Sequence, residues 1–194
     1  MRSPSEDDGA VVVNTTSRAS QEWERSLSPF FLGPCRLYDD HESRVLENAW
    51  QYSKLYAVHA DAEGEPTEAY WAWAEAGWAS PKAVRYPMGK EGRPLCSLWD
   101  GHGLGYVEAR KRIYGPLYVE AVRKTEGWKK LEALRSEGRP IVLRDFDGYD
   151  HVALGMSLTD VLNDPGRKMG HAFVLAMMLT QDPGLEQFAP ICGR

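Results

Sequence analysis

The sequence predicts a helix-rich α+β fold in a single domain. Several stretches repeat apolar residues every three to four positions, as amphipathic helices do, whereas IVLRDF (141–146) is short and apolar enough for a buried strand. The chain has 194 residues, enough to bury a core, and no repeat, low-complexity tract or Pro/Gly-rich linker divides it. We therefore expect one folded domain at 21–194, after a flexible segment at 1–20.

The elements of the N-terminal half follow from apolar spacing and turn residues. The segment at 1–20 is polar and expected to be flexible, with VVV at 11–13 as the possible exception. Residues 28–40 mix turn formers with a short apolar run, which predicts loop and strand. A long helix is expected over 42–60, and a second over 67–78, between a Gly/Pro break and a Ser-Pro pair. The apolar positions of the first helix should face the core: Leu46, Trp50 and Ala57.

The C-terminal half alternates loops with helices. Residues 99–122 should form a glycine-rich entry into a helix that is interrupted near Gly115–Pro116, because proline lacks the N–H group that a helix needs. Two further helices are expected over 126–137 and 168–180, on either side of the strand at 141–146. The irregular loop that precedes these elements carries three basic residues: Arg85, Lys90 and Arg93.

Charge and cysteine content narrow the class of protein. A formal net charge of −5 argues against broad nonspecific nucleic-acid binding but leaves room for a local basic pocket. Three distant cysteines suggest neither a disulfide framework nor a metal pair, which favours a reducing compartment. The N-terminus does not resemble a signal peptide, and the apolar run AFVLAMML (172–179) is too short to cross a bilayer. We expect a cytoplasmic protein with no membrane partner.

Some motifs carry only a weak signal of chemistry. GHGLG (101–105) could present N–H groups to a phosphate, but it matches neither the Walker nor the dinucleotide pattern, and a structural loop is the commoner explanation. The five histidines lack metal-ligand spacing and no Ser-based nucleophile motif occurs, so we expect no metal and no cofactor. Most tryptophans should pack in the core. Trp50 is the candidate for stacking, because it lies beside a polar stripe.

Two groups of polar residues could form a site. Glu47, Gln51 and Lys54 recur at i, i+4 and i+7 and fall on one helix face, which suits either a solvated surface or the floor of a site. DFDGYDH (145–151) follows the predicted strand directly, and its acidic residues suit either a cleft or a turn. These acidic residues are Asp145, Asp147 and Asp150. The residues alone leave both alternatives open.

Several stretches match the motifs of one known family in the same order. LSPF (27–30) stands where that family has F-S-N-F, and Glu47, Gln51 and Lys54 keep its E-x-x-x-Q-x-x-K spacing. Its later motifs are similar to YVEARKRIY (106–114), LEALRSEGRPIVLRD (131–145) and RKMGHAFVLAMM (167–178). Over residues 26–180 the chain thus resembles the NADAR (YbiA-like) domain superfamily, as a divergent member.

The resemblance implies the α+β fold of that family and hydrolysis of an N-glycosidic bond, from ribose C1 to nitrogen, without a metal or redox cofactor. Known family activities act on ribosylamine intermediates of riboflavin synthesis and on ADP-ribosylated guanine. The implied partner is a small nucleotide-like substrate or an ADP-ribosylated base, including a base in modified nucleic acid. The chain departs from the family at Pro29, where the family has Asn, at Asn48, where it has His, and in lacking a Trp-Gly pair.

The resemblance also implies a role for each site residue. Glu47 would stabilise the positive charge that develops at ribose C1, and Asp147 would activate water or bind ribose. Gln51 would bind a ribose hydroxyl or a base edge. A substrate phosphate would meet one of three basic residues: Lys54, Lys90 or Arg110. The other expected substrate-binding residues are Ser28, Phe30, Trp50, Tyr106, Asp150 and His171.

Two other functions fit the same residues. One is a noncatalytic module that binds ADP-ribose or a modified nucleotide, which the missing Trp-Gly and Asn favour. The other is an enzyme that transfers a group to a nucleotide. Release of free base or amine from ADP-ribosylated guanosine or a ribosylamine phosphate distinguishes hydrolysis from binding alone.

Overall fold

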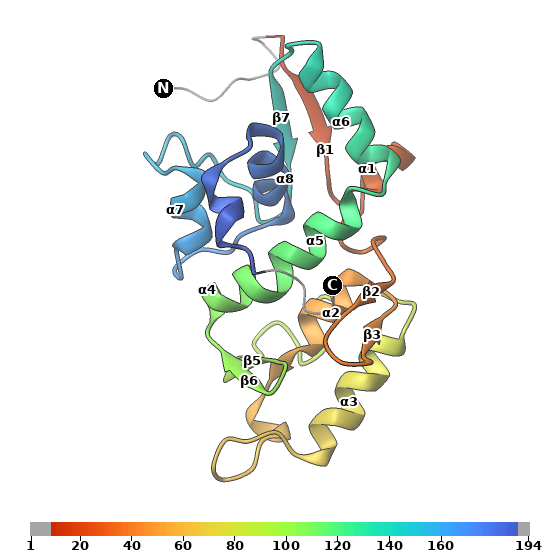
Figure 1. Cartoon of the computed structure of the whole chain (residues 1–194), viewed down its shortest axis with the longest axis vertical. Helices are drawn as coiled ribbons and strands as arrows, with labels where there is room; N and C mark the ends of the chain where they lie inside the picture. The colour runs from red at the N-terminus through yellow and green to blue at the C-terminus, as the bar shows by residue number, and fades with distance from the viewer. Residues whose placement is uncertain (1–8, 190–194) are drawn as a thin grey trace.

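Two strands that lie about 130 residues apart in the sequence pair with each other (Figure 1). β1 (Val11–Asn14) runs parallel to β7 (Ile141–Arg144), with Val11 opposite Ile141. The structure, a computed structural model, describes residues 9–189. β1 contains VVV at 11–13, the part of residues 1–20 that the sequence set apart from the flexible chain, and its valines fit a pleated apolar strand pair. Residues 1–8 of the expected flexible segment lie outside the described residues.

The predicted helix at 42–60 is wrong in its extent. α2 covers only Leu46–Tyr52, between β3 (Glu42–Ser43) and β4 (Lys54–Leu55). Both short strands have antiparallel partners, β2 (Cys35–Arg36) for β3 and β5 (Cys96–Trp99) for β4. These ladders satisfy backbone groups that a longer helix would have satisfied internally. Ala57 is exposed in the 3₁₀ turn η2 (Ala57–His59), and not in the core as expected.

Three predicted helices are confirmed, with ends that differ by at most three residues: α3 (Glu68–Ala79), α6 (Glu126–Ser136) and α8 (His171–Thr180). Three short helical segments were not predicted: α1 (Glu22–Arg25), α7 (Leu158–Asn163) and the 3₁₀ turn η4 (Pro183–Gln187). The sequence did signal α7, because Ser157 and Asp160 form a capping box at its start.

Residues 99–122 begin as a hairpin and continue as one long irregular helix. β5 and β6 (His102–Leu104) are joined at Asp100 and Gly101, which both have positive φ, as a tight hairpin turn requires. Then follow α4 (Tyr106–Ala109), the π-helical turn η3 (Arg110–Tyr114) and α5 (Gly115–Val122). The predicted irregularity occurs one turn before Pro116, because the proline ring excludes the carbonyl group four residues earlier.

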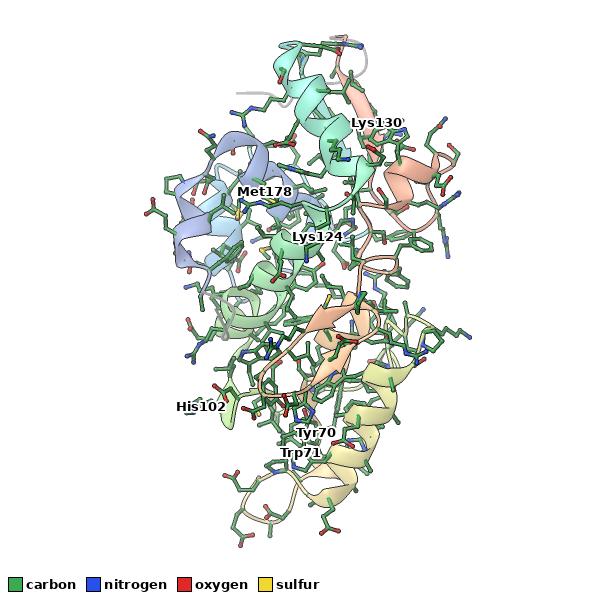
Figure 2. All side chains as sticks on the ribbon, turned by 45° about the vertical axis from the view of Figure 1, so that its right-hand side comes forward. Tyr70, Trp71, His102, Lys124, Lys130 and Met178 are labelled. Carbon is green, nitrogen blue, oxygen red and sulfur yellow. The ribbon has the colours of Figure 1, made fainter. Side chains whose placement is uncertain are left out.

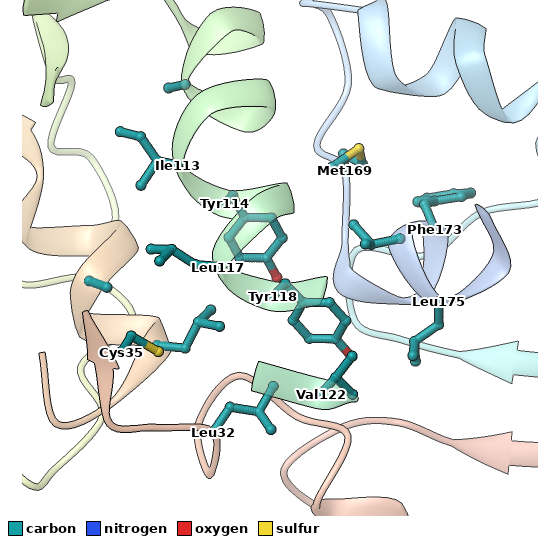
Figure 3. Packing of buried hydrophobic residues seen from close by; sticks show 14 of the residues in the cluster. Leu32, Cys35, Ile113, Tyr114, Leu117, Tyr118, Val122, Met169, Phe173 and Leu175 are labelled. Atoms are coloured by element: carbon teal, nitrogen blue, oxygen red, sulfur yellow. The ribbon is translucent and has the colours of Figure 1, made fainter. Parts of the chain in front are cut away.

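α5 crosses the middle of the molecule, with α8, β1 and β7 on one side and α2, α3 and β5 on the other (Figure 1). Figure 3 shows Tyr118 and Val122 of α5 between the α8 side of the core and the segment that carries Leu32 and Cys35. The hydroxyl of Tyr118 donates to the carbonyl oxygen of Leu27 at 2.6 Å, which ties α5 to the chain before α2.

An aromatic cluster fills the end of the molecule that holds α3, where Figure 2 shows Tyr70 and Trp71. Tyr70 and Trp78 are fully buried there, as expected of most tryptophans, and Trp71 packs against the core. Among the described residues, no helix is both long enough and apolar enough to span a bilayer.

Candidate functional site

One pocket, of about 140 Å³, brings together ten of the twelve expected site residues. They are Ser28, Phe30, Glu47, Trp50, Gln51, Lys54, Tyr106, Arg110, Asp147 and His171. The volume is close to that of an engineered protein cavity of about 150 Å³ that binds benzene. The pocket therefore accommodates one ring-sized group, such as a ribose or a base, with any larger part of a ligand at its mouth.

The N-terminus of α2 fixes one wall of the pocket. The backbone N–H of Glu47 donates to the carbonyl oxygen of Pro29 at 3.0 Å, and that of Leu46 donates to Leu32 at 2.8 Å. These bonds satisfy two N–H groups that have no partner inside the helix. They also hold the turn that carries Ser28 and Phe30 beside the Glu47 side chain.

The predicted polar stripe, Glu47 and Gln51 of α2 with Lys54 of β4, forms part of the pocket wall and is not a solvated outer surface. Gln51 Nε2 donates to Glu47 Oε1 at 2.9 Å, and Lys54 Nζ donates to Gln51 Oε1 at 2.6 Å. Glu47 and Gln51 are buried, at 5% and 6% exposure. Lys54 also lies 4.9 Å from the centre of the Trp50 ring, a cation–π contact. The spacing i, i+4, i+7 thus becomes a chain of hydrogen bonds that ends on the Glu47 carboxylate.

Burial changes the proton affinity of both charged members of this chain. It raises the pKa of Glu47, because an ionised carboxylate loses its hydration, while the Gln51 hydrogen bond and the Lys54 charge act in the opposite direction. Burial also lowers the pKa of Lys54 to about 8, against the charge of Glu47, which raises it. Perturbed acids and bases that share a pocket are typical of functional sites.

His171 lines the pocket, but both of its ring nitrogens are occupied within the protein. Nδ1 lies 3.1 Å from Asp145 Oδ2, and Nε2 lies 2.8 Å from the carbonyl oxygen of Thr15. Both partners are acceptors, and the neighbouring Asp145 carboxylate raises the pKa of His171, so this environment favours the ring protonated at both nitrogens. The expected substrate-binding role of His171 is therefore replaced by a structural one, since no ring nitrogen is left for a ligand.

The Asp145–His171 pair is stabilised in its charged form. Burial alone would lower the pKa of His171, but the neighbouring Asp145 carboxylate raises it. Burial alone would raise the pKa of Asp145, but the charge of His171 and its hydrogen bond lower it. Gly170 allows this approach, because a Cβ atom at that position would lie 2.0 Å from Asp145 Oδ2.

Arg110 is fully buried, and backbone oxygens occupy both of its terminal nitrogens. Its Nη1 donates to the carbonyl oxygens of Val161, Leu162 and Asp164, and its Nη2 donates to that of Arg167. The oxygens of Val161, Leu162 and Asp164 lie at the C-terminal end of α7, where helix carbonyls lack partners. Among the described residues, the Nε–H group of Arg110 has no partner, so the expected phosphate role of Arg110 stays a prediction, restricted to that nitrogen. Its guanidinium also supports the pocket wall through Tyr106, whose ring centre lies 4.1 Å away.

The position expected for a second carboxylate is occupied by an ion pair. Arg85 Nη2 lies 2.5 Å from Asp147 Oδ2, and the two side chains are partly exposed, 30% for Arg85 and 28% for Asp147. Arg85 directly follows residues 80–84, which are hydrogen-bonded to the side chain of Asn48 in α2. The Asn48 amide nitrogen donates to the carbonyl oxygens of Gly77, Ser80 and Lys82, and its oxygen accepts from the Val84 N–H. Asn48 thus positions Arg85.

Two expected site residues lie elsewhere. Lys90 and Asp150 are exposed and do not line the pocket. Asp150 instead accepts a hydrogen bond from the Ala153 N–H, as the turn alternative predicts. Residues 101–105 do not line the pocket either, because they form the β5–β6 hairpin and the residue before α4. The pocket therefore does not support the phosphate roles considered for Lys90 and for this segment, which stay predictions.

The pocket also contains residues that the sequence did not place there: Thr16, Ser17, Arg85, Tyr86, Tyr114, Asp145, Phe146 and Lys168 among them. Arg85 had been noted only as a basic loop residue, and Asp145 only as one of three aspartates. Tyr114 reaches the pocket wall from the π-helical turn, which the sequence signalled only through Pro116.

The pocket can hold a ring beside the buried carboxylate of Glu47. Lys54 is linked to that carboxylate by two successive hydrogen bonds through Gln51, and aromatic rings line the pocket. In the described part of the chain, no three His, Cys, Asp or Glu side chains gather closely enough to hold a metal ion. Comparison with protein families, curated proteins and solved structures finds no match to this chain.

Proposed function

We propose that this protein is an N-glycosidase that hydrolyses the bond from ribose C1 to nitrogen in a nucleotide-like or ADP-ribosylated substrate, as the resemblance to the NADAR domain implies. One observation carries the proposal. The Glu47 carboxylate lies buried in the wall of a pocket that fits a single ring, and Gln51 holds it in place.

The physical argument concerns charge. Breaking the bond at C1 leaves positive charge on the ribose, and a fixed carboxylate stabilises that charge best where water is excluded. Lys54 favours the ionised form of Glu47, because its positive charge lowers the pKa of the carboxyl group. A helix also holds the carboxylate more rigidly than a loop would.

The reaction balances with water alone. Water oxygen bonds to C1 as the C1–N electron pair leaves with the nitrogen. One water proton stays on the new hydroxyl group, and the other passes by way of Asp147 to the nitrogen. In this scheme Ser28 and Gln51 bind ribose hydroxyls, and Trp50, Phe30 and Tyr106 contact the base. Lys54 bears the positive charge next to Glu47.

The test is the variant Glu47→Gln, which keeps shape and hydrogen bonding but removes the charge. With ADP-ribosylated guanosine or a ribosylamine phosphate at saturation, single-turnover release of base or amine should fall by about 10²–10⁴-fold. Glu75→Gln, at an exposed position of α3, is the matched control and should keep the wild-type rate. A folded Glu47→Gln protein with the wild-type rate would contradict the proposal.

A noncatalytic ADP-ribose-binding module is the second candidate. The observation that favours it is the Arg85–Asp147 ion pair, which occupies the carboxylate that would move the proton. This candidate predicts that wild-type protein binds ADP-ribose but releases no product from either substrate.

A further inference from the structure

Two cations and two exposed aromatic rings meet at the mouth of the pocket. The Arg85 guanidinium lies 5.4 Å from the centre of the Tyr86 ring and 5.6 Å from that of Phe146. The Lys168 ammonium lies 5.7 Å from the same Tyr86 ring. Lys168 is also close enough to the interior for its charge to lower the pKa of Lys54. The Tyr86 ring thus lies close to both positive charges.

Positive charge exceeds negative charge in the pocket lining, although the whole chain is acidic. Among the lining residues, three carboxylates face five cationic groups: Lys54, Arg85, Arg110, Lys168 and His171. Asp145 is paired with His171 and Asp147 with Arg85. In the described part of the chain, no carboxylate lies within ion-pair distance of Lys168 or Lys54. The pocket lining therefore carries more positive than negative groups, and the positive charge that has no carboxylate partner among the described residues includes that of Lys168 at the mouth.

The Arg85–Asp147 pair is weak enough to be exchanged. It is a contact of one nitrogen with one oxygen, and solvent reaches both side chains. Ion pairs that solvent reaches contribute less to stability than fully buried pairs do, and this pair is partly exposed. A phosphate offers Arg85 two or more acceptor oxygens, and the planar guanidinium binds phosphate through two parallel hydrogen bonds.

We propose that Arg85 and Lys168 form a binding site for the phosphate group of a phosphorylated ribose, and that Asp147 is the internal competitor which this phosphate displaces from Arg85. The inference deepens the proposed function and rests on it for the position of the ribose. Displacement frees the Asp147 carboxylate at the moment when substrate is bound. A substrate without a phosphate leaves Asp147 paired and unable to move a proton.

If phosphate and Asp147 compete for Arg85, removing the Asp147 charge should strengthen phosphate binding, whereas a merely structural ion pair predicts no such gain. The probes are ribose 5-phosphate and ribose, titrated calorimetrically in a phosphate-free buffer. Arg85→Gln and Lys168→Gln should each weaken ribose 5-phosphate binding about tenfold. Asp147→Asn should instead tighten it several-fold, because Arg85 no longer has an internal partner. The double variant Arg85→Gln/Asp147→Asn should bind like Arg85→Gln alone, and ribose should bind equally to all variants.

Lys90→Gln is the matched control, because Lys90 is a basic residue of the same loop outside the pocket. It should bind ribose 5-phosphate like wild type. Weaker binding by Asp147→Asn, unchanged binding by Arg85→Gln, or equal losses for Lys90→Gln and Arg85→Gln would each overturn the proposal. Hydrolysis is measured separately: if Glu47-dependent turnover persists while these binding results fail, the phosphate site is wrong and the proposed function stands.

Discussion

At the scale of single residues, Lys54 and Glu47 each set the charge of the other. The ammonium of Lys54 lowers the pKa of Glu47, and the Glu47 carboxylate raises that of Lys54. Burial acts against both ionised forms. Both groups are charged only between the raised pKa of Glu47 and the pKa of Lys54, which is about 8. The proposed hydrolysis should therefore have a bell-shaped dependence on pH.

Lys54→Met tests this coupling. Wild-type kcat/KM should decline as the pH rises through about 8, where Lys54 loses its proton. In the variant that basic limb should disappear. The acidic limb should move to higher pH, because no cation remains to lower the pKa of Glu47. Product release measured across the pH range gives both limbs. A variant that keeps the basic limb would assign it to another group, and Lys90→Met should keep the wild-type profile.

At the scale of the elements, Asn48 joins three parts of the chain: α2, the end of α3 and the segment that leads to Arg85. Asn48→Ala leaves the Val84 N–H and three carbonyl groups without this partner. An unsatisfied buried group costs about 1–3 kcal/mol, so the melting temperature should fall by several degrees. Ribose 5-phosphate binding should also weaken, because Arg85 is less firmly placed.

Asn163→Ala is the control for Asn48→Ala. The Asn163 side chain makes one hydrogen bond at an exposed helix end, to the Thr159 carbonyl oxygen. Its removal should change neither the melting temperature nor the binding by a comparable amount. If Asn48→Ala melted and bound like wild type, Asn48 would not position Arg85.

The elements also show what sequence reasoning could reach. Glu47 and Gln51 align through local helix geometry, which their spacing alone predicted. Lys54 lies beyond the end of α2, in β4, and still donates to Gln51. The Arg85–Asp147 contact joins residues that are 62 positions apart in the sequence, and local sequence patterns do not predict contacts over such a separation. Arg110 and His171 were expected to bind substrate, but their partners include backbone carbonyl oxygens, which every residue carries and no sequence distinguishes.

At the scale of the whole molecule, the buried His171–Asp145 pair ties α8 to the chain after β7, and His171 also binds the carbonyl of Thr15 after β1. Its effect on stability depends on pH. Because the pKa of His171 is raised, its contribution is complete below the ordinary value of about 6.5 and is lost as the pH rises through the raised value. Because the pKa of Asp145 is lowered, its contribution is complete above about 3.9 and is lost as the pH falls through the lowered value.

His171→Asn should therefore destabilise the fold most between about pH 4 and about pH 6.5. Removing one partner of a buried pair costs about 3–5 kcal/mol, or roughly 10 °C in melting temperature for a chain of this size. At strongly alkaline pH the difference from wild type should shrink, because wild-type His171 has then lost its charge. Melting curves of both proteins over the pH range measure it. A difference that does not vary with pH would show that His171 is neutral.

The parallel pairing of β1 with β7 has a consequence for synthesis on the ribosome. β1 leaves the ribosome long before its partner, since about 130 residues separate them. At about 5–20 residues per second, the valines of β1 wait on the order of ten seconds for their partner strand. During that interval the nascent chain presents an apolar strand with an unpaired edge, and chaperones bind such segments. His171 emerges later still, so the pocket closes only after α8 has been translated.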